Sequence, residues 1–434
     1  MRWPGLSRCA GAAVALVACS STPTATFTLT TGEEADALTR SPAPTTLVVQ
    51  ALDTNGNAQE LARTALPTDE LSLGDKSRTA VGALRVLAID GAGKTLLRGE
   101  TLYVQFGALE NAPLDVFIQR TGELARMPGS TVTLDAPRLG LTVARYVVAA
   151  SGTNLALYDL LLLKSLTSVP AMPRPARSLV TFGTAAIVID EAGATTVDLS
   201  TGAATDLPAP TGITFAEIAG GTTVALADGS AYVVGGTRTT GGPSARVLVF
   251  GKDGTVSAAT LATPREGACA TWVEGRGLVI VGGSVTGVGA EVLAPGAVQS
   301  APLAYAPDAV KSCGASALDA SHVLVAGGVG STADVGGAAP ARVVDLACAS
   351  NCVPAVWPGA LPLVRAESFT LAQDAVLVAG DDATGASRVF RATAAGTTEI
   401  PVKAARKNAR LVALPIKGTV AIVGGSAPIE QYIE

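Results

Sequence analysis

The chain has 434 residues, of which 48% are hydrophobic, 15% charged and 4% aromatic, with 48 glycines and 25 prolines. This composition excludes an intrinsically disordered chain, which needs low hydrophobicity, and it favours many short buried strands joined by turns. The net charge of −5 comes without any basic stripe in the sequence, so nucleic acid is not an expected partner.

The first residues have the pattern of an export signal. Arg2 and Arg8 supply positive charge, residues 10–18 are apolar, and Leu16-Val-Ala-Cys19 reads as the cleavage site. An apolar stretch of this length is too short for a spanning helix, which needs about 20 residues. We therefore expect the protein to be exported.

The cleavage motif resembles the bacterial lipobox. The resemblance implies that residues 1–18 are removed as a lipoprotein signal peptide, that Cys19 carries the lipid, and that residues 19–25 form a polar tether. Ser20 after the cysteine implies an outer-membrane lipid anchor by similarity to the bacterial sorting rule. A periplasmic or secreted protein is the alternative.

Residues 26–120 are expected to form a β-sandwich domain. Polar and apolar residues alternate there between turn-forming residues, which predicts strands at 46–53, 84–90, 101–106 and 114–119. Several short strands without a long helical pattern suggest an immunoglobulin-like β-sandwich. The alternative is a meander that packs directly on the following domain.

Residues 121–434 contain a repeat, in which a short apolar run ends in a glycine pair. The clear copies lie 44 to 53 residues apart, and degenerate copies at 146–150 and 186–190 bring the number to seven. Repeats at this period indicate a solenoid, an array or a propeller. The clear copies are Val233-Val-Gly-Gly236, Val279-Ile-Val-Gly-Gly283, Val323-Leu-Val-Ala-Gly-Gly328, Val376-Leu-Val-Ala-Gly380 and Ala421-Ile-Val-Gly-Gly425.

Other features of each copy resemble the kelch repeat. Several copies open with a Pro-Arg pair such as Pro137-Arg138, and third strands end in pairs such as Tyr158-Asp159, although the family's tryptophan in strand four is mostly missing. The resemblance implies an all-β protein whose second domain is a seven-bladed kelch-like β-propeller. The last copy lacks a fourth strand, and residues 122–128 are expected to supply it and close the ring.

The arginines at the start of the copies are the candidate binding residues. If these starts align, the arginines surround one mouth of the central channel. In some kelch proteins such arginines bind acidic peptides, so the resemblance implies a protein or acidic-peptide partner. The alternative is that each arginine holds a carboxylate or carbonyl of its own structure. The residues are Arg138, Arg177, Arg265, Arg365 and Arg406.

Four cysteines remain after the signal, and export predicts two disulfides with three possible connectivities. Cys348 and Cys352 flank a short loop, whereas Cys269 and Cys313 occupy equivalent positions of neighbouring copies. Buried free thiols are the alternative. The chain has one histidine and no Cys-x-x-Cys motif, so no metal and no other cofactor are expected.

The predicted role is non-catalytic binding at the cell envelope. With His322 as the single histidine, a Ser-His-Asp triad is not expected. One alternative is an extracellular carbohydrate-active enzyme that uses two channel carboxylates, and another is a purely structural envelope protein. The carboxylates considered for the enzyme are Glu217, Glu266, Glu291 and Glu367.

Overall fold

The computed structural model describes residues 27–67, 80–105, 114–236, 242–330, 337–372 and 375–434. The expected signal peptide, Cys19 and the tether lie outside these residues. Within them the regular structure is β strand, apart from one 3₁₀ turn, η2 (Phe215–Glu217). None of the described residues belongs to a helix with the length and apolar character needed to cross a membrane.

The N-terminal strands form one sheet of seven strands, in the order β1-β7-β5-β4-β2-β3, with β6 beside β4. Apolar residues on one face of β2, β4, β5 and β7 make its core, among them Val49, Val86 and Ile118. An immunoglobulin-like sandwich requires two facing sheets and stays a prediction. The strands are β1 (Phe27–Thr30), β2 (Thr46–Leu52), β3 (Ala58–Ala65), β4 (Val81–Ile89), β5 (Thr95–Glu100), β6 (Val104–Gln105) and β7 (Leu114–Arg120).

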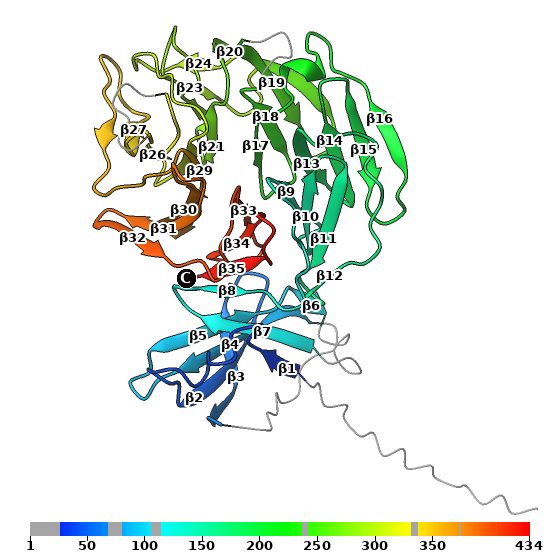
Figure 1. The fold of residues 1–434 in the computed structure, drawn as a ribbon, viewed down its shortest axis with the longest axis vertical. Helices are drawn as coiled ribbons and strands as arrows, with labels where there is room; N and C mark the ends of the chain where they lie inside the picture. Colours follow the sequence, from blue (N-terminus) through cyan, green and yellow to red (C-terminus); the bar gives the residue numbers. More distant parts are fainter. Residues whose placement is uncertain (1–26, 68–79, 106–113, 237–241, 331–336, 373–374) are drawn as a thin grey trace, which may run out of the picture.

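The rest of the described chain forms seven four-stranded antiparallel sheets arranged as a ring, which confirms the predicted all-β, seven-bladed propeller (Figure 1). Within each of blades 1 to 3, neighbouring strands are also consecutive in the sequence. Their strands are β9 (Arg138–Thr142), β10 (Tyr146–Ser151), β11 (Asn154–Asp159) and β12 (Lys164–Ser165); β13 (Ser178–Phe182), β14 (Ala185–Ile189), β15 (Ala194–Asp198) and β16 (Ala204–Leu207); and β17 (Thr222–Ala225), β18 (Ala231–Val234), β19 (Ser244–Phe250) and β20 (Val256–Arg265).

Blades 4 to 6 have the same order, and blade 7 contributes three strands of its own. Their strands are β21 (Cys269–Val273), β22 (Gly277–Val281), β23 (Ala290–Leu293) and β24 (Ala301–Pro302); β25 (Gly314–Ala317), β26 (His322–Ala326), β27 (Arg342–Asp345) and β28 (Ala355–Val356); β29 (Arg365–Ala372), β30 (Ala375–Asp381), β31 (Ser387–Thr393) and β32 (Gly396–Ile400); and β33 (Arg410–Ala413), β34 (Thr419–Val423) and β35 (Glu430–Ile433).

Blade 7 is completed by β8 (Leu124–Arg126), which precedes blade 1 in the sequence. Tyr432 of β35 lies opposite Leu124, and Glu430 lies opposite Arg126. The amide of Met127 also donates to the carbonyl of Ile429 at 2.8 Å. The predicted closure is therefore confirmed, and it removes the free sheet edges that an open ring would expose.

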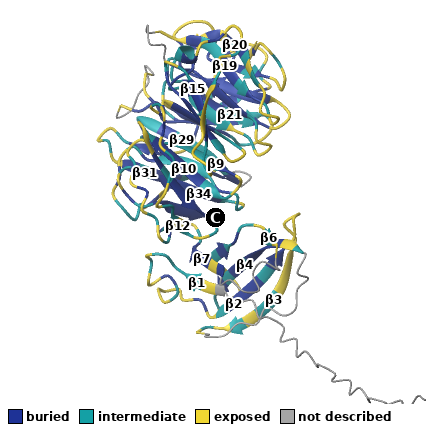
Figure 2. Cartoon of the chain, turned by 90° about the vertical axis from the view of Figure 1, so that its right-hand side faces the viewer, coloured by how far each residue is buried: buried dark blue, intermediate teal, exposed yellow. Residues whose placement is uncertain are grey.

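The core of the propeller consists of seven apolar layers, one between each pair of neighbouring blades. The second strand of a blade is covered on both faces, so its side chains enter two layers in turn. In β18, for example, Val233 packs against blade 2 and Val234 against blade 4. This two-sided burial explains why the repeats read as continuous apolar runs rather than as alternating patterns, and Figure 2 shows the buried strands and the exposed loops.

The N-terminal sheet lies beside blades 7 and 1 (Figure 1). Phe117 of β7 packs into the apolar layer between these two blades. The amide nitrogen of Gln119 donates to the carbonyl of Gln431 at 3.0 Å, inside the molecule. The two parts of the protein are thus joined through the blade that closes the ring.

Candidate functional site

The first strands of the blades surround the channel. They contact one another in the order β9, β13, β17, β21, β25, β29, β33 and back to β9. The channel holds a cavity of about 350 Å³, lined mainly by residues at or near the starts of these strands. This volume lies within the usual range of small-ligand sites.

The charges in this cavity are gathered on one side. Arg365, Arg410 and Arg138 are the first residues of β29, β33 and β9, which are consecutive in the ring. All three line the cavity, together with Glu367 of β29. Blades 3, 4 and 5 contribute uncharged residues, namely Gly220, Gly221, Thr222, Thr223, Gly267, Ala270, Ser312, Cys313, Gly314 and Ala315.

Arg410 and Arg365 are held by carboxylates. Nη1 of Arg410 donates to Glu367 Oε1 at 2.8 Å, and the amide of Leu411 donates to the other oxygen of Glu367 at 2.7 Å. Nε and Nη2 of Arg365 donate to Asp381 Oδ2 at 2.9 and 2.6 Å. Nη1 of Arg365 is buried and has no hydrogen-bond partner in the described chain. Burial, followed by the charge of Arg410, lowers the pKa of Arg365.

Asp381 explains a departure from the repeat. It stands where the other clear copies have a glycine, and besides Arg365 it accepts hydrogen bonds from the hydroxyl of Ser387 at 2.6 Å and the amide of Asn408 at 2.9 Å. Asp381 therefore fixes the arginine of blade 6 in place.

Arg138 differs from its two neighbours because its side chain has no hydrogen bond or ion pair with any described residue. Burial is the main cause that lowers its pKa to about 10, and the like charge of Arg410 adds to this effect. The guanidinium is still charged at neutral pH. Arg138 is thus a positive charge in the cavity wall with no paired carboxylate of its own.

Arg177, the residue before β13, lies outside the set of residues that line the cavity. Its side chain is half exposed and forms an ion pair with Glu191 at 3.4 Å. Its guanidinium reaches toward Gly220, where an added Cβ would lie 3.4 Å from Nη2. Arg177 adds to the positive charge near Arg138, since its field contributes to the lowered pKa of Arg138.

Arg265 and Arg406 are placed differently from the prediction. Each stands four residues before the first, inner strand of a blade. These strands, β21 and β33, begin at Cys269 and Arg410. Their side chains are 0% exposed and pair with Glu291 and Glu430, which are also 0% exposed. The five arginines therefore do not form one ring, because the Pro-Arg pairs and their degenerate versions occur at two structural positions.

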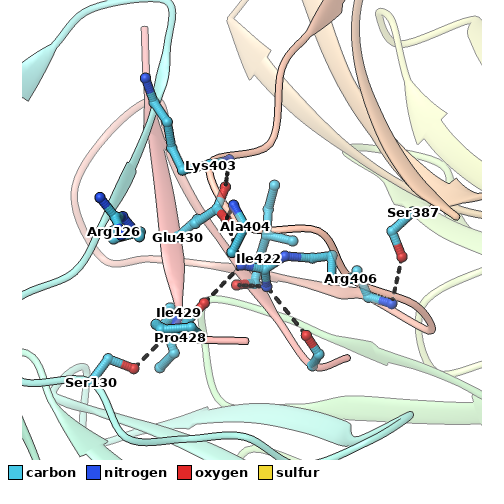
Figure 3. A network of polar contacts seen from close by, with 12 residues as sticks. Arg126, Ser130, Ser387, Lys403, Ala404, Arg406, Ile422, Pro428, Ile429 and Glu430 are labelled. Carbon is cyan, nitrogen blue, oxygen red and sulfur yellow. Dashed lines mark hydrogen bonds and ion pairs between the residues drawn. The ribbon is translucent and has the colours of Figure 1, made fainter. Parts of the chain in front are cut away.

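The contacts of Arg406 show the role of an arginine that lies four residues before an inner strand (Figure 3). Arg406 Nη2 donates to Glu430 Oε1 at 2.6 Å and to the carbonyl of Pro428 at 2.8 Å, while the amides of Lys403 and Ala404 donate to the same carboxylate. Arg265 does the same in blade 4 with Glu291 and the carbonyls of Gly282, Val288 and Gly289. Each of these two arginines precedes a blade in the sequence and holds the loops of that blade.

The candidate glutamates of the enzyme alternative are dispersed. Glu217 accepts from the amide of Thr214 at η2, Glu266 pairs with Lys311, and Glu291 is buried with Arg265. Of the four, Glu367 alone lines the cavity in the described part of the chain. Glycoside hydrolysis uses two facing carboxylates, and a second candidate does not line this cavity.

Both predicted disulfides form. Cys269, the first residue of β21, is bonded to Cys313, just before β25, with a Cα–Cα distance of 5.5 Å. This bond joins the inner strands of blades 4 and 5 at the uncharged wall of the cavity. Cys348 and Cys352 close the loop between β27 and β28, with a Cα–Cα distance of 5.9 Å. Among the described residues there is also no group of three metal-ligating side chains.

No protein-family model matches the sequence, and no curated protein matches it significantly. Solved structures with a similar fold include the Pan2 WD40 domain of Neurospora crassa, with 11% identity, a TM-score of 0.43 and coverage of 70% of this chain and 88% of that one. The N-terminal domain of Nup159 has 11% identity, a TM-score of 0.44 and coverage of 72% and 94%. TolB from Acinetobacter baumannii has 11% identity, a TM-score of 0.37 and coverage of 76% and 78%. Similarity this distant carries no argument about function.

Proposed function

We propose that this protein is an exported, lipid-anchored propeller of the kelch type, preceded by an immunoglobulin-like β-sandwich, and that its role is non-catalytic binding. The lipobox-like sequence at Cys19 supports the outer-membrane anchor. The two disulfides support export, because disulfides persist in oxidising compartments. The partner is an acidic segment of another envelope protein, which enters the channel between Arg138, Arg365 and Arg410.

The unpaired guanidinium of Arg138 is the observation that carries the binding proposal. A charge that is partly shielded from water and has no paired carboxylate destabilises the native state, and a group of this kind in a cavity is a candidate binding residue. A guanidinium and a carboxylate form short charge-assisted hydrogen bonds in a planar pair.

The test is a titration of the full-length protein with a capped pentapeptide that has one central aspartate, with the asparagine peptide as control. We expect the aspartate peptide to bind and Arg138→Gln to weaken its binding at least tenfold, because the charge that receives the carboxylate is lost. Arg246→Gln is the matched control, since Arg246 is also partly buried but lies on β19, away from the cavity. Equal binding by the wild type and Arg138→Gln would overturn the proposal.

The anchor has its own test. Cys19→Ser removes the thiol that would carry lipid, and the protein is expected to move from the membrane fraction to the soluble fraction. Retention of the variant in the membrane fraction would contradict lipid anchoring at this residue.

A further inference from the structure

The cavity wall carries more positive than negative charges. The wall holds the three guanidiniums of Arg138, Arg365 and Arg410. Two carboxylates pair with them: Glu367, which also lines the cavity, pairs with Arg410 at 2.8 Å, and Asp381, outside the lining, pairs with Arg365 at 2.6 Å. The wall therefore has one positive charge in excess, and this charge is located at Arg138.

The surroundings do not alter this balance. The opposite wall, from blades 3, 4 and 5, contributes no charged side chain to the described lining of the cavity. Beyond the lining, Arg177 is paired with Glu191, and Lys311 is paired with Glu266. One negative charge on a ligand is thus sufficient to neutralise the cavity.

The charge balance limits what can bind. In a channel whose walls partly shield it from water, a ligand group with one negative charge is compensated, whereas a second negative charge on the same group has no counter-charge. An aspartate or glutamate side chain or a chain terminus carries one charge, but a phosphoryl group carries about −1.5 to −2 at pH 7. The cavity is therefore suited to a single carboxylate.

Glu367 is the residue that sets this limit. It occupies Arg410 from inside the cavity, and its field also acts on Arg138. We infer that Glu367 determines the charge selectivity of the channel, because by pairing with Arg410 it leaves Arg138 to receive one carboxylate and excludes phosphate-like dianions. This inference rests on the proposed function and specifies the class of ligand that the site accepts.

The experiment compares two capped pentapeptides that differ only in the central residue, aspartate or phosphoserine, by calorimetric titration at constant ionic strength. We expect the wild type to prefer the aspartate peptide. Glu367→Gln raises the excess to two charges, and the ratio of the two affinities is expected to shift at least tenfold toward phosphoserine. An unchanged ratio in this variant would overturn the inference.

Two further variants keep the test decisive if Glu367→Gln fails to fold. Arg410→Gln removes the excess charge and is expected to abolish binding of the aspartate peptide. Combining Glu367→Gln with Arg410→Gln restores one excess charge and removes both partners of a pair, which proteins tolerate better than the loss of one partner. The double variant should bind the aspartate peptide at least tenfold more tightly than Arg410→Gln, and equal binding of the two would refute the charge rule.

The outcomes separate the inference from the proposed function. Loss of aspartate binding in Arg138→Gln, combined with an unchanged ratio in Glu367→Gln, supports the binding site and rejects the role of Glu367. Absence of any binding by the wild type rejects the proposed function itself. A titration with acetate identifies the source of the carboxylate. Acetate that binds as tightly as the aspartate peptide would overturn the acidic protein segment as the ligand and indicate a free small acid.

Discussion

Replacing Arg138 with methionine is expected to stabilise the protein and to remove its binding of an acidic peptide. Burial and the neighbouring guanidiniums lower the pKa of Arg138 to about 10, which means that the charged form is disfavoured in the native state. Each pKa unit corresponds to about 1.4 kcal/mol, so the charge costs the native state on the order of 2 kcal/mol after an allowance for the part that water reaches. Methionine retains an unbranched apolar side chain of similar reach without the charge.

The measurement is the free energy of unfolding from urea titration, followed by fluorescence. The control is Arg406→Met, which leaves Glu430 buried without its ion-pair partner and is expected to cost about 3–5 kcal/mol. The same substitution should therefore change stability in opposite directions at two arginines of the same chain. If Arg138→Met destabilises the protein as Arg406→Met does, Arg138 has a structural partner and the reasoning is wrong.

The pH dependence of this effect follows from the direction of the pKa shift. Because the pKa of Arg138 is lowered in the native state, the unfolded chain binds more protons above about pH 10, and the stability contributed by this group rises with pH there. Below pH 10 the charge is present in both states and its cost is complete. The gap in stability between wild type and Arg138→Met should thus be constant from pH 6 to 9 and narrow above pH 10.

Further predictions concern the ring, the disulfides and the site. Deleting residues 429–434 removes β35 and its pairing with β8, so the melting temperature should fall sharply; an unchanged melting curve would contradict closure by these strands. Replacing both Cys269 and Cys313 with alanine should cost about 4 kcal/mol of unfolding free energy for their separation of 44 residues, against about 2 kcal/mol for Cys348 and Cys352 at a separation of 4; equal losses in urea titrations would contradict this order. Affinity for the aspartate peptide should be constant to about pH 9 and fall above pH 10 as Arg138 loses its proton; an affinity that stays constant to pH 11 would exclude Arg138 as the receiving charge.

The blade number was accessible from the sequence because it depends on the second strands, and the closure was accessible because the last copy lacks a fourth strand. Runs such as Val279-Ile-Val before a glycine pair are buried on both faces, and that pattern survives even where other parts of the repeat have diverged. The same register placed Cys269 and Cys313 at equivalent positions of neighbouring copies, but three connectivities stayed open until the structure showed this bond.

The arginine set was less predictable because the loop before the first strand varies in length. Arg138 pairs in register with Ala150 and Arg410 with Val423, so counting back about twelve residues from the end of the second strand would have identified both. The Pro-Arg pairs and their degenerate versions selected Arg265 and Arg406 and missed Arg410, which stands four residues after Arg406. Arg365 lies further from Asp381 because both strands of that hairpin are longer.

The strand β8 has a consequence for how the protein matures. It lies at residues 124–126, and its partner β35 ends at Ile433, so the last hydrogen bonds of the propeller join segments some three hundred residues apart. Contacts of such long range form slowly. During synthesis the amino-terminal portion emerges with β8 unpaired, and six blades can assemble before the final residues arrive. The ring therefore closes only after the last strand, β35, has been made, and a chain that ends before this strand would be left with an open sheet edge.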